Sequence, residues 1–219
     1  MSVLPRRFQR IKNVLNSRMG DLTVLIEGVN KPHNLSAIIR TCDAAGVFQA
    51  NFICDNSKVK TFNSTAQGSQ KWVKLRNHQS YSKATNVLRN EGFKLYGTSL
   101  NKNSIDYRDL DFTKNTCFVL GAEKWGLSKE LIAQVDESIY IPMNGMVQSL
   151  NVSVAGAILL FEAIRQRKNK NLIPFKGEGL NQKEYKKTLF EWTYPELIDS
   201  YKKSNKDYPF LNNDGEIYK

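Results

Sequence analysis

Residues 139–167 read IYIPMNGMVQSLNVSVAGAILLFEAIRQR, and their pattern is the most informative about the fold. The pattern predicts a strand that ends at Pro142, a loop that contains glycine, and a long helix that starts at Ser149 or Asn151. The helix begins with small residues over 153–157, which let another helix or chain pack closely. A strand, a polar loop and a helix in this order are typical of α/β folds.

Upstream, residues 116–128 read TCFVLGAEKWGLS, an apolar strand that runs into a loop with two glycines. Gly121 follows the strand directly, and a glycine there lets a ligand approach the backbone closely. Glu123 is the lone acid of the loop and a candidate catalytic group. The alternative interpretation is an ordinary turn with a solvated Glu123 and an anchoring Trp125.

Further upstream, residues 27–47 read EGVNKPHNLSAIIRTCDAAGV, where a strand ends at a polar loop that enters a helix. Side chains gather around ligands at such switch points. Asn34 is expected to cap the helix. Arg40 lies off the apolar stripe, so its guanidinium can bind a phosphate or a carboxylate. The alternative is a capped helix with an Arg40–Asp43 pair.

The same alternation extends along most of the chain and predicts an α/β domain with a mostly parallel sheet. Strands are expected at 22–27, 50–54, 71–75, 93–98, 116–120 and 138–141. Helices are expected at 5–19, 34–46, 82–91, 128–135 and about 148–167, with short ones near 181–191 and 195–204 after a linker at 168–179.

The charge of the chain points to nucleic acid as a partner. Its 32 Lys and Arg against 21 Asp and Glu give a net charge of +11, which attracts polyanions. The first 20 residues contain no acid and carry Arg6, Arg7, Arg10, Lys12 and Arg18. The long helix ends in Arg165, Arg167 and Lys168, which suit a helix C-terminus and can also bind RNA.

Several other classes of protein lack support in the sequence. There is no GxGxxG, no P-loop and no nucleophile elbow, and no apolar run is long enough to span a membrane. His33 is interpreted as a loop residue and His78 as a surface residue, so no metal site is expected. Cys42, Cys54 and Cys117 lack zinc-ligand spacing and are interpreted as reduced thiols of a cytoplasmic protein.

The segments HNLSAIIRTCDAAGV, VLGAEKWGLS and IPMNGMVQSLNVSVAGAILLFEAIR resemble, in this order, the three motifs of the SPOUT superfamily. They are most similar to the SpoU/TrmH branch of RNA 2′-O-methyltransferases, and the extensions resemble its tRNA guanosine-18 subgroup. The resemblance implies a SPOUT domain over 20–167 with a deep C-terminal trefoil knot. Extensions at 1–19 and 168–219 flank it.

The resemblance also implies an activity, a cofactor and partners. The expected reaction is S-adenosylmethionine-dependent methylation of the 2′-hydroxyl of guanosine 18 in the tRNA D-loop, by a homodimer and without DNA, membrane or metal. Two alternatives stay open: 2′-O-methylation of ribosomal RNA, and a non-catalytic RNA-binding protein on the same fold.

Site residues carried over from the family's motifs fall into three groups. The expected catalytic group is Asn34, Arg40, Glu123, Ser149 and Asn151. The expected cofactor contacts are Thr98, Gly121, Ile141 and Leu150. The expected RNA contacts are Arg7, Arg10, Arg18, Arg165 and Arg167. The proton acceptor stays open between Arg40 and Glu123, because a guanidinium is a poor base at neutral pH.

Overall fold

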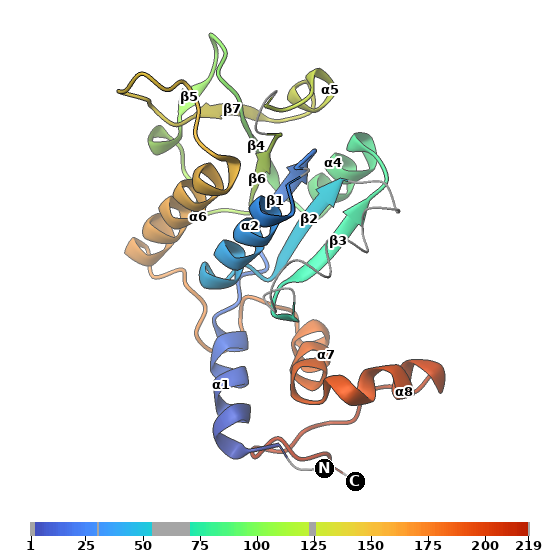
Figure 1. Ribbon diagram of the computed structural model, residues 1–219. Helices are drawn as coiled ribbons and strands as arrows, with labels where there is room; N and C mark the ends of the chain where they lie inside the picture. Colours follow the sequence, from blue (N-terminus) through green and yellow to red (C-terminus); the bar gives the residue numbers. More distant parts are fainter. Residues whose placement is uncertain (1–2, 30, 54–70, 123–125, 219) are drawn as a thin grey trace. The chain divides into compact units, whose positions relative to one another are not determined.

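The computed structural model describes residues 3–29, 31–53, 71–122 and 126–218 (Figure 1). The chain divides into two compact units. Gly20–Ile173 forms the first, here called the α/β unit. Met1–Met19 and Pro174–Lys219 form the second, here called the terminal unit, so the two expected extensions pack together.

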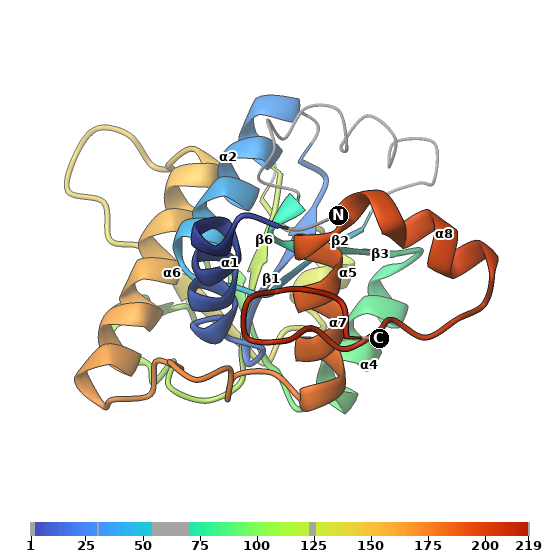
Figure 2. The ribbon, with the colours of Figure 1, turned by 90° about the horizontal axis from the view of Figure 1, so that it is seen from below.

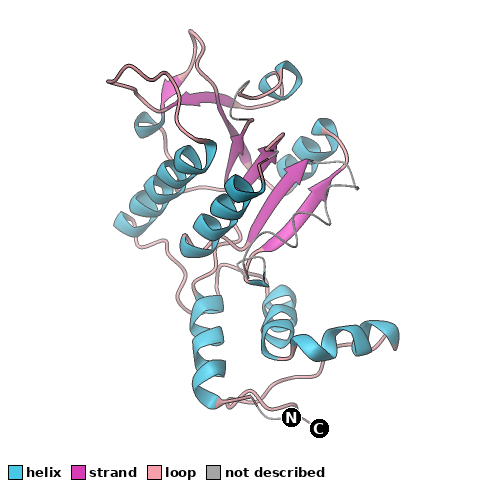
Figure 3. Cartoon of the chain, in the orientation of Figure 1, coloured by secondary structure: helices cyan, strands magenta, loops and turns pink. Residues whose placement is uncertain are grey.

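The α/β unit is built on one seven-stranded sheet, in which every described strand pair is parallel (Figure 3). The strand order is β3-β2-β1-β6-β4-β7-β5. The strands are β1 (Leu22–Glu27), β2 (Gln49–Ile53), β3 (Lys74–His78), β4 (Lys94–Thr98), β5 (Ile105–Asp106), β6 (Thr116–Leu120) and β7 (Glu137–Tyr140). This arrangement confirms the predicted α/β class.

The central strands are buried on both faces, which explains their continuous apolar sequence. All residues of β1 and β6 are buried, and Val24 pairs with Ala50 on one side and Phe118 on the other. Helices cover each face. α2 (Pro32–Ala44) and α6 (Val152–Asn169) lie side by side on one face (Figures 1 and 2).

The opposite face packs against α4 (Tyr81–Asn90) and α5 (Lys129–Ile132). Its core cluster is Leu25, Ala84, Leu88, Phe93, Leu95, Cys117, Val119, Leu127 and Leu131. Successive residues of a strand point to opposite faces. Val119 therefore belongs to this cluster, whereas its neighbour Leu120 lies under Gly156 of α6.

The terminal unit consists of α1 (Pro5–Asn16), α7 (Gln182–Thr193), the 3₁₀ turn η3 (Pro195–Leu197) and α8 (Ile198–Lys203). An aromatic cluster forms its core: Phe190 stacks on Tyr208 with ring centroids 4.5 Å apart, and Tyr194 and Tyr201 pack around the pair. α1 is amphipathic, as predicted, with Phe8, Ile11 and Leu15 buried.

The structure contradicts the predicted cap of one helix and confirms a predicted cap of another. The helix expected from Asn34 begins earlier, at Pro32, because proline at the first position suits a helix start. Lys31 is its N-cap and makes no side-chain cap, so the prediction that Asn34 is the cap is wrong. The long helix begins at Val152, and its N-cap is Asn151, one of the two predicted candidates.

Other expectations differ from the structure in detail. His33 lies in α2 rather than in a loop, and His78 is buried at 6% exposure rather than lying on the surface. The short strand β5 and the 3₁₀ turn η2 (Tyr107–Asp109) are absent from the prediction. The trefoil knot stays a prediction.

Candidate functional site

A cleft of about 870 Å³ lies at the carboxyl ends of β4, β6 and β7. Its lining includes the four residues predicted to bind a cofactor: Thr98, Gly121, Ile141 and Leu150. They come from the ends of three parallel strands and from the loop before α6. Ligands in open α/β sheets bind at such strand ends. The volume lies within the roughly 300–1,000 Å³ of small-molecule sites.

The loop after β6 requires glycine at Gly121. A Cβ atom there would lie 2.3 Å from the carbonyl carbon of Gly126, a contact that backbone atoms cannot relieve. The Gly126 amide donates to the carbonyl of Ala122 at 2.9 Å, and Gly126 has a φ of +67°. This hydrogen bond holds Ala122 and Gly126 together, and both line the cleft beside Gly121. Glu123 and Trp125 lie outside the described residues.

A buried acid, Glu27, supports the far end of this loop. Its side chain is 6% exposed and its Oε2 accepts a hydrogen bond from the Ser128 amide at 2.9 Å. Burial and a hydrogen bond to Glu27 raise the pKa of Tyr81. Glu27 is absent from the residues that the sequence predicts for the site. The available signal was an acid in an otherwise apolar strand.

Two of the predicted catalytic residues meet across helices. Asn151 Nδ2 donates to Asn34 Oδ1 at 3.2 Å, which joins the start of α6 to α2. Asn151 Oδ1 accepts from the Ser153 amide at 2.8 Å and from the Ser153 hydroxyl at 2.6 Å. Asn34 is 2% exposed. Ser149 lies just before this group and lines the cleft.

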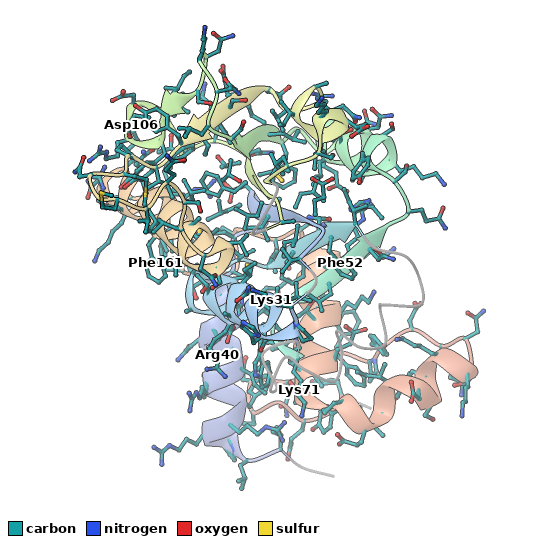
Figure 4. The ribbon with its side chains drawn as sticks, turned by 45° about the horizontal axis from the view of Figure 1, so that its top comes forward. Lys31, Arg40, Phe52, Lys71, Asp106 and Phe161 are labelled. Carbon is teal, nitrogen blue, oxygen red and sulfur yellow. The ribbon has the colours of Figure 1, made fainter. Side chains whose placement is uncertain are left out.

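Arg40 is separated from Asn34 along α2. It is exposed on α2, six residues beyond Asn34, which is about 9 Å of helix rise. Figure 4 shows it further along the helix than Lys31. Arg40 is not among the described residues that line the cleft. Within the described residues of one protomer, Arg40 therefore does not contribute to the lining of the cleft.

Three of the five arginines predicted to bind RNA are exposed. Arg7 and Arg10 lie on the outer face of α1. Arg165 lies on α6 and bonds Glu162 through Nε at 2.8 Å and Nη2 at 2.7 Å. This guanidinium lowers the pKa of the Glu162 carboxyl.

The other two arginines are buried at 1% exposure, so the sequence-based expectation of an RNA contact needs correction. Arg18 lies over the Trp192 ring, 5.4 Å from its centroid. Arg167 donates to backbone carbonyls and to Asp21 inside the α/β unit. Arg167 directs Nε, Nη1 and Nη2 to partners within the α/β unit, so its guanidinium is not presented to a phosphate outside the protein.

The described residues also bear on metal binding, membrane insertion and the state of the cysteines. They contain no group of three or more His, Cys, Asp or Glu side chains that could hold a metal ion. No helix within the described ranges is long and apolar enough to cross a membrane. Cys42 and Cys117 are buried free thiols, and burial raises the pKa of Cys117. Cys54 lies outside the described residues.

Comparison with protein families gives two matches that together span nearly the whole chain. Residues 21–161 match the model of the SpoU rRNA Methylase family. Residues 165–219 match the model for the C-terminal region of SpoU rRNA methylases. The first match covers the complete cleft and both asparagines of the α2–α6 contact.

Curated relatives resemble the chain over most of their length. A tRNA (guanosine(18)-2′-O)-methyltransferase of Escherichia coli is 43% identical over 97% of this chain and 93% of its own. The protein of the same name from Thermus thermophilus is 50% identical over 85% of this chain and 95% of its own.

One solved structure is similar to most of this chain. The Aquifex aeolicus TrmH/SpoU tRNA modifying enzyme has a TM-score of 0.78, is 38% identical, and covers 88% of this chain and 98% of its own.

Proposed function

The chain belongs to the SpoU methylase family, and from this premise we propose that it methylates the ribose 2′-hydroxyl of guanosine 18 in the tRNA D-loop. The methyl donor is S-adenosylmethionine. The observation that carries the proposal is the cleft at the strand ends, which gathers the four residues expected to bind that cofactor. The extent of the match to guanosine-18 methyltransferases supports the choice of substrate.

The cleft suits the cofactor in size and in the chemistry of its lining. Gly121 has no side chain to block the backbone, and Ile141 and Leu150 offer apolar contacts. Thr98 Oγ1 donates to the Val119 carbonyl at 3.1 Å, which fixes that wall. S-adenosylmethionine supplies a methyl group on a positively charged sulfur when it is bound.

The residues around the cleft have to align the ribose and remove a proton. Alignment of reacting groups alone contributes about 7–11 kcal/mol in favourable cases. Arg40 holds a phosphate beside the target ribose through two parallel hydrogen bonds, which a guanidinium provides and an ammonium does not. The proton acceptor is Arg40 or Glu123, and Glu123 is the better base at neutral pH.

The protein acts as a homodimer in this proposal, and the dimer accounts for the position of Arg40. Val154 and Phe161 of α6 are 46% and 51% exposed and lie about two helical turns apart, on the same side of the helix. Figure 4 shows Phe161 on α6. Pairing through this surface lets Arg40 of one protomer serve the cleft of its partner.

Two of the small residues of α6 face the chain's own sheet and cleft. A Cβ atom on Gly156 would lie 3.0 Å from Leu120 Cδ1 of the same chain, and Ala155 lines the cleft. The close approach that the small residues allow is therefore to the protein's own sheet at Gly156. The proposed dimer surface is the exposed stripe of Val154 and Phe161 instead.

Ribosomal RNA is the second candidate substrate, because the matching family model is described as that of rRNA methylases. A methyl-transfer assay with labelled S-adenosylmethionine on purified tRNA and purified rRNA separates the two. We expect label in tRNA alone. Label in rRNA alone contradicts the proposal. Because the proposed substrate is tRNA, we also propose that the protein acts in the cytoplasm.

A further inference from the structure

The side chain of Asn34 contains a buried donor that bonds no described residue. Asn34 is 2% exposed, and its Nδ2 has no hydrogen-bond partner within the part of the chain that the structure describes. A buried donor without a partner costs about 1–3 kcal/mol, so such groups are rare in native proteins. The donor therefore calls for a ligand that supplies an acceptor.

The polarity of Asn34 is fixed from the start of α6. The Ser153 backbone amide can only donate, so the atom of Asn151 that it meets at 2.8 Å must be the oxygen. The other end of Asn151 is then the NH₂ group, which donates to Asn34 at 3.2 Å. That contact in turn requires the oxygen of Asn34, so its remaining group is a donor.

The Ser153 hydroxyl strengthens this arrangement. It donates to the same oxygen of Asn151 at 2.6 Å, so rotation of the Asn151 amide by 180° would lose two hydrogen bonds rather than one. Ser153 is half-buried on the first turn of α6. We call the chain of contacts from Ser153 through Asn151 to Asn34 the amide relay.

The amide relay ends beside the cleft but outside its lining. Asn151 lies between Leu150 and Val152, which both line the cleft, whereas neither Asn151 nor Asn34 does. The free donor is therefore separate from the described lining of the cofactor cleft, and it becomes available to a second molecule only when the buried Asn34 side chain is uncovered. RNA presents ribose and phosphate oxygens as acceptors.

We propose that Ser153 is a positioning residue whose hydroxyl reinforces the polarity of the amide relay, so that Asn34 Nδ2 donates to an oxygen of the RNA substrate. This inference rests on the proposed function, since it requires an RNA substrate at the cleft. It assigns a role to Ser153 and gives Asn34 a chemical direction, as donor rather than acceptor.

The first test compares Ser153→Ala with Ser153→Thr, which keeps the hydroxyl. We expect Ser153→Ala to lower kcat for tRNA methylation about three- to tenfold, the scale of one hydrogen bond. The KM for S-adenosylmethionine and the Tm should stay unchanged, and Ser153→Thr should restore kcat. Ser82→Ala, the same change at an exposed position of α4, is the matched control. Weakened binding of S-adenosylhomocysteine, or no rescue by threonine, contradicts the proposal.

A double-mutant cycle tests whether Ser153 acts through Asn34. Asn34→Asp keeps an acceptor for Asn151 Nδ2 and removes the donor. We expect Ser153→Ala to cause no further loss of kcat in the Asn34→Asp background, because the group that it orients is gone. Additive losses mean that Ser153 acts independently of Asn34 and overturn the proposal.

A readout without turnover separates failure of the amide relay from failure of the proposed function. In ¹⁵N-labelled protein, Ser153→Ala should shift the side-chain NH₂ signals of both Asn151 and Asn34, and tRNA should shift that of Asn34. An unmoved Asn34 signal in Ser153→Ala overturns the relay even if methylation is normal. A wild-type protein that methylates no RNA overturns the proposed function, while the shift caused by Ser153→Ala still tests the relay.

Discussion

Arg167 Nη1 donates to the Asp21 carboxylate at 2.5 Å, inside the α/β unit. Arg167 Nε donates to the Phe112 carbonyl at 3.0 Å, and Nη2 to the carbonyls of Lys114 at 2.7 Å and Asp21 at 3.1 Å. These carbonyls belong to the segments that enter β1 and β6. The side chain therefore fastens the start of two central strands to the end of α6.

Arg167→Met should destabilise the protein by about 3–5 kcal/mol, because it leaves the carbonyls without a donor and Asp21 without its buried partner. Arg165→Met is the matched control on the same helix. The Arg165 side chain is 60% exposed, so its surface pair with Glu162 should contribute far less to stability than the buried contacts of Arg167 do. Urea unfolding measures both. Equal small losses contradict the structural role of Arg167.

His78 should make stability depend on pH. Its Nε2 lies 3.0 Å from Asn51 Oδ1, and burial, followed by the charge of Arg76, lowers its pKa, while Glu91 acts in the opposite direction. A lowered pKa means that the folded state binds the proton less readily than the unfolded chain does. The contribution is thus complete above about pH 6.5, the unfolded value, and is lost as pH falls toward the folded pKa.

The test is the slope of unfolding free energy against pH between 5 and 7. His78→Gln should flatten this slope, and His33→Gln, a change at an exposed position of α2, should leave it unchanged. Lys83 and Arg76 face the same groove, so both variants are compared at one ionic strength. An unaltered slope in His78→Gln contradicts this account.

Two central strands show where prediction from the sequence succeeds, and Arg167 and His78 show where it fails. The strands Leu22–Glu27 and Thr116–Leu120 were predicted to the residue, because a strand buried on both faces has a continuous apolar sequence. Arg167 and His78 were placed on the surface, because polarity favours exposure on average. Their burial depends on partners distant in the sequence, such as Asp21 and Asn51, which periodicity does not reveal.

The candidate site likewise contains residues that the sequence predicts and contacts that it does not predict. The sequence predicts Thr98, Gly121, Ile141 and Leu150 as cofactor contacts through resemblance to a family, and the fold brings all four to one cleft. Ser153 was noted only for its small size. Its hydrogen bonds to Asn151 follow from the N-cap geometry of α6, which requires the exact start of the helix.

The exposed arginines of α1 should bind RNA electrostatically. Arg7→Glu with Arg10→Glu should weaken tRNA binding and flatten its dependence on salt, because each lost phosphate contact lowers the log–log slope by roughly 0.7–0.9. Lys183→Glu with Lys187→Glu reverses the same number of charges on exposed positions of α7 and serves as the control. Equal salt slopes for the wild type and the α1 variant contradict the prediction.

The exposed stripe of α6 should form the dimer interface. Phe161→Glu should convert a dimer of about twice 25.0 kDa into a monomer, because it places a charge in an apolar contact. Phe175→Glu, at a phenylalanine that is 66% exposed in the terminal unit, should remain dimeric. Light scattering at micromolar concentration distinguishes these states. A monomeric wild type at that concentration refutes the dimer.

Arg40 should be the most sensitive catalytic position. Arg40→Ala and Arg40→Lys should each lower methyl transfer at least about 10²-fold, since a lysine cannot reproduce the two-pronged phosphate contact. Both variants should stay folded and bind S-adenosylhomocysteine as the wild type does. Near-normal turnover of Arg40→Lys at saturating tRNA and cofactor reduces Arg40 to a diffuse electrostatic contact.

Mixed dimers locate the cleft on which Arg40 acts. One protomer carries Arg40→Ala and the other carries Leu150→Arg, which fills the cleft. If Arg40 serves the partner's cleft, one of the two sites is intact and activity returns on mixing. Inactive mixed dimers place Arg40 and its cleft in the same protomer.

Nucleotide mapping by mass spectrometry identifies the ribose of tRNA that the protein methylates. Unmodified tRNA is incubated with the wild-type protein and S-adenosylmethionine, digested and sequenced by fragment mass. We expect a single added methyl group on the ribose of guanosine 18. Methylation at another nucleotide, on a base, or on ribosomal RNA alone contradicts it.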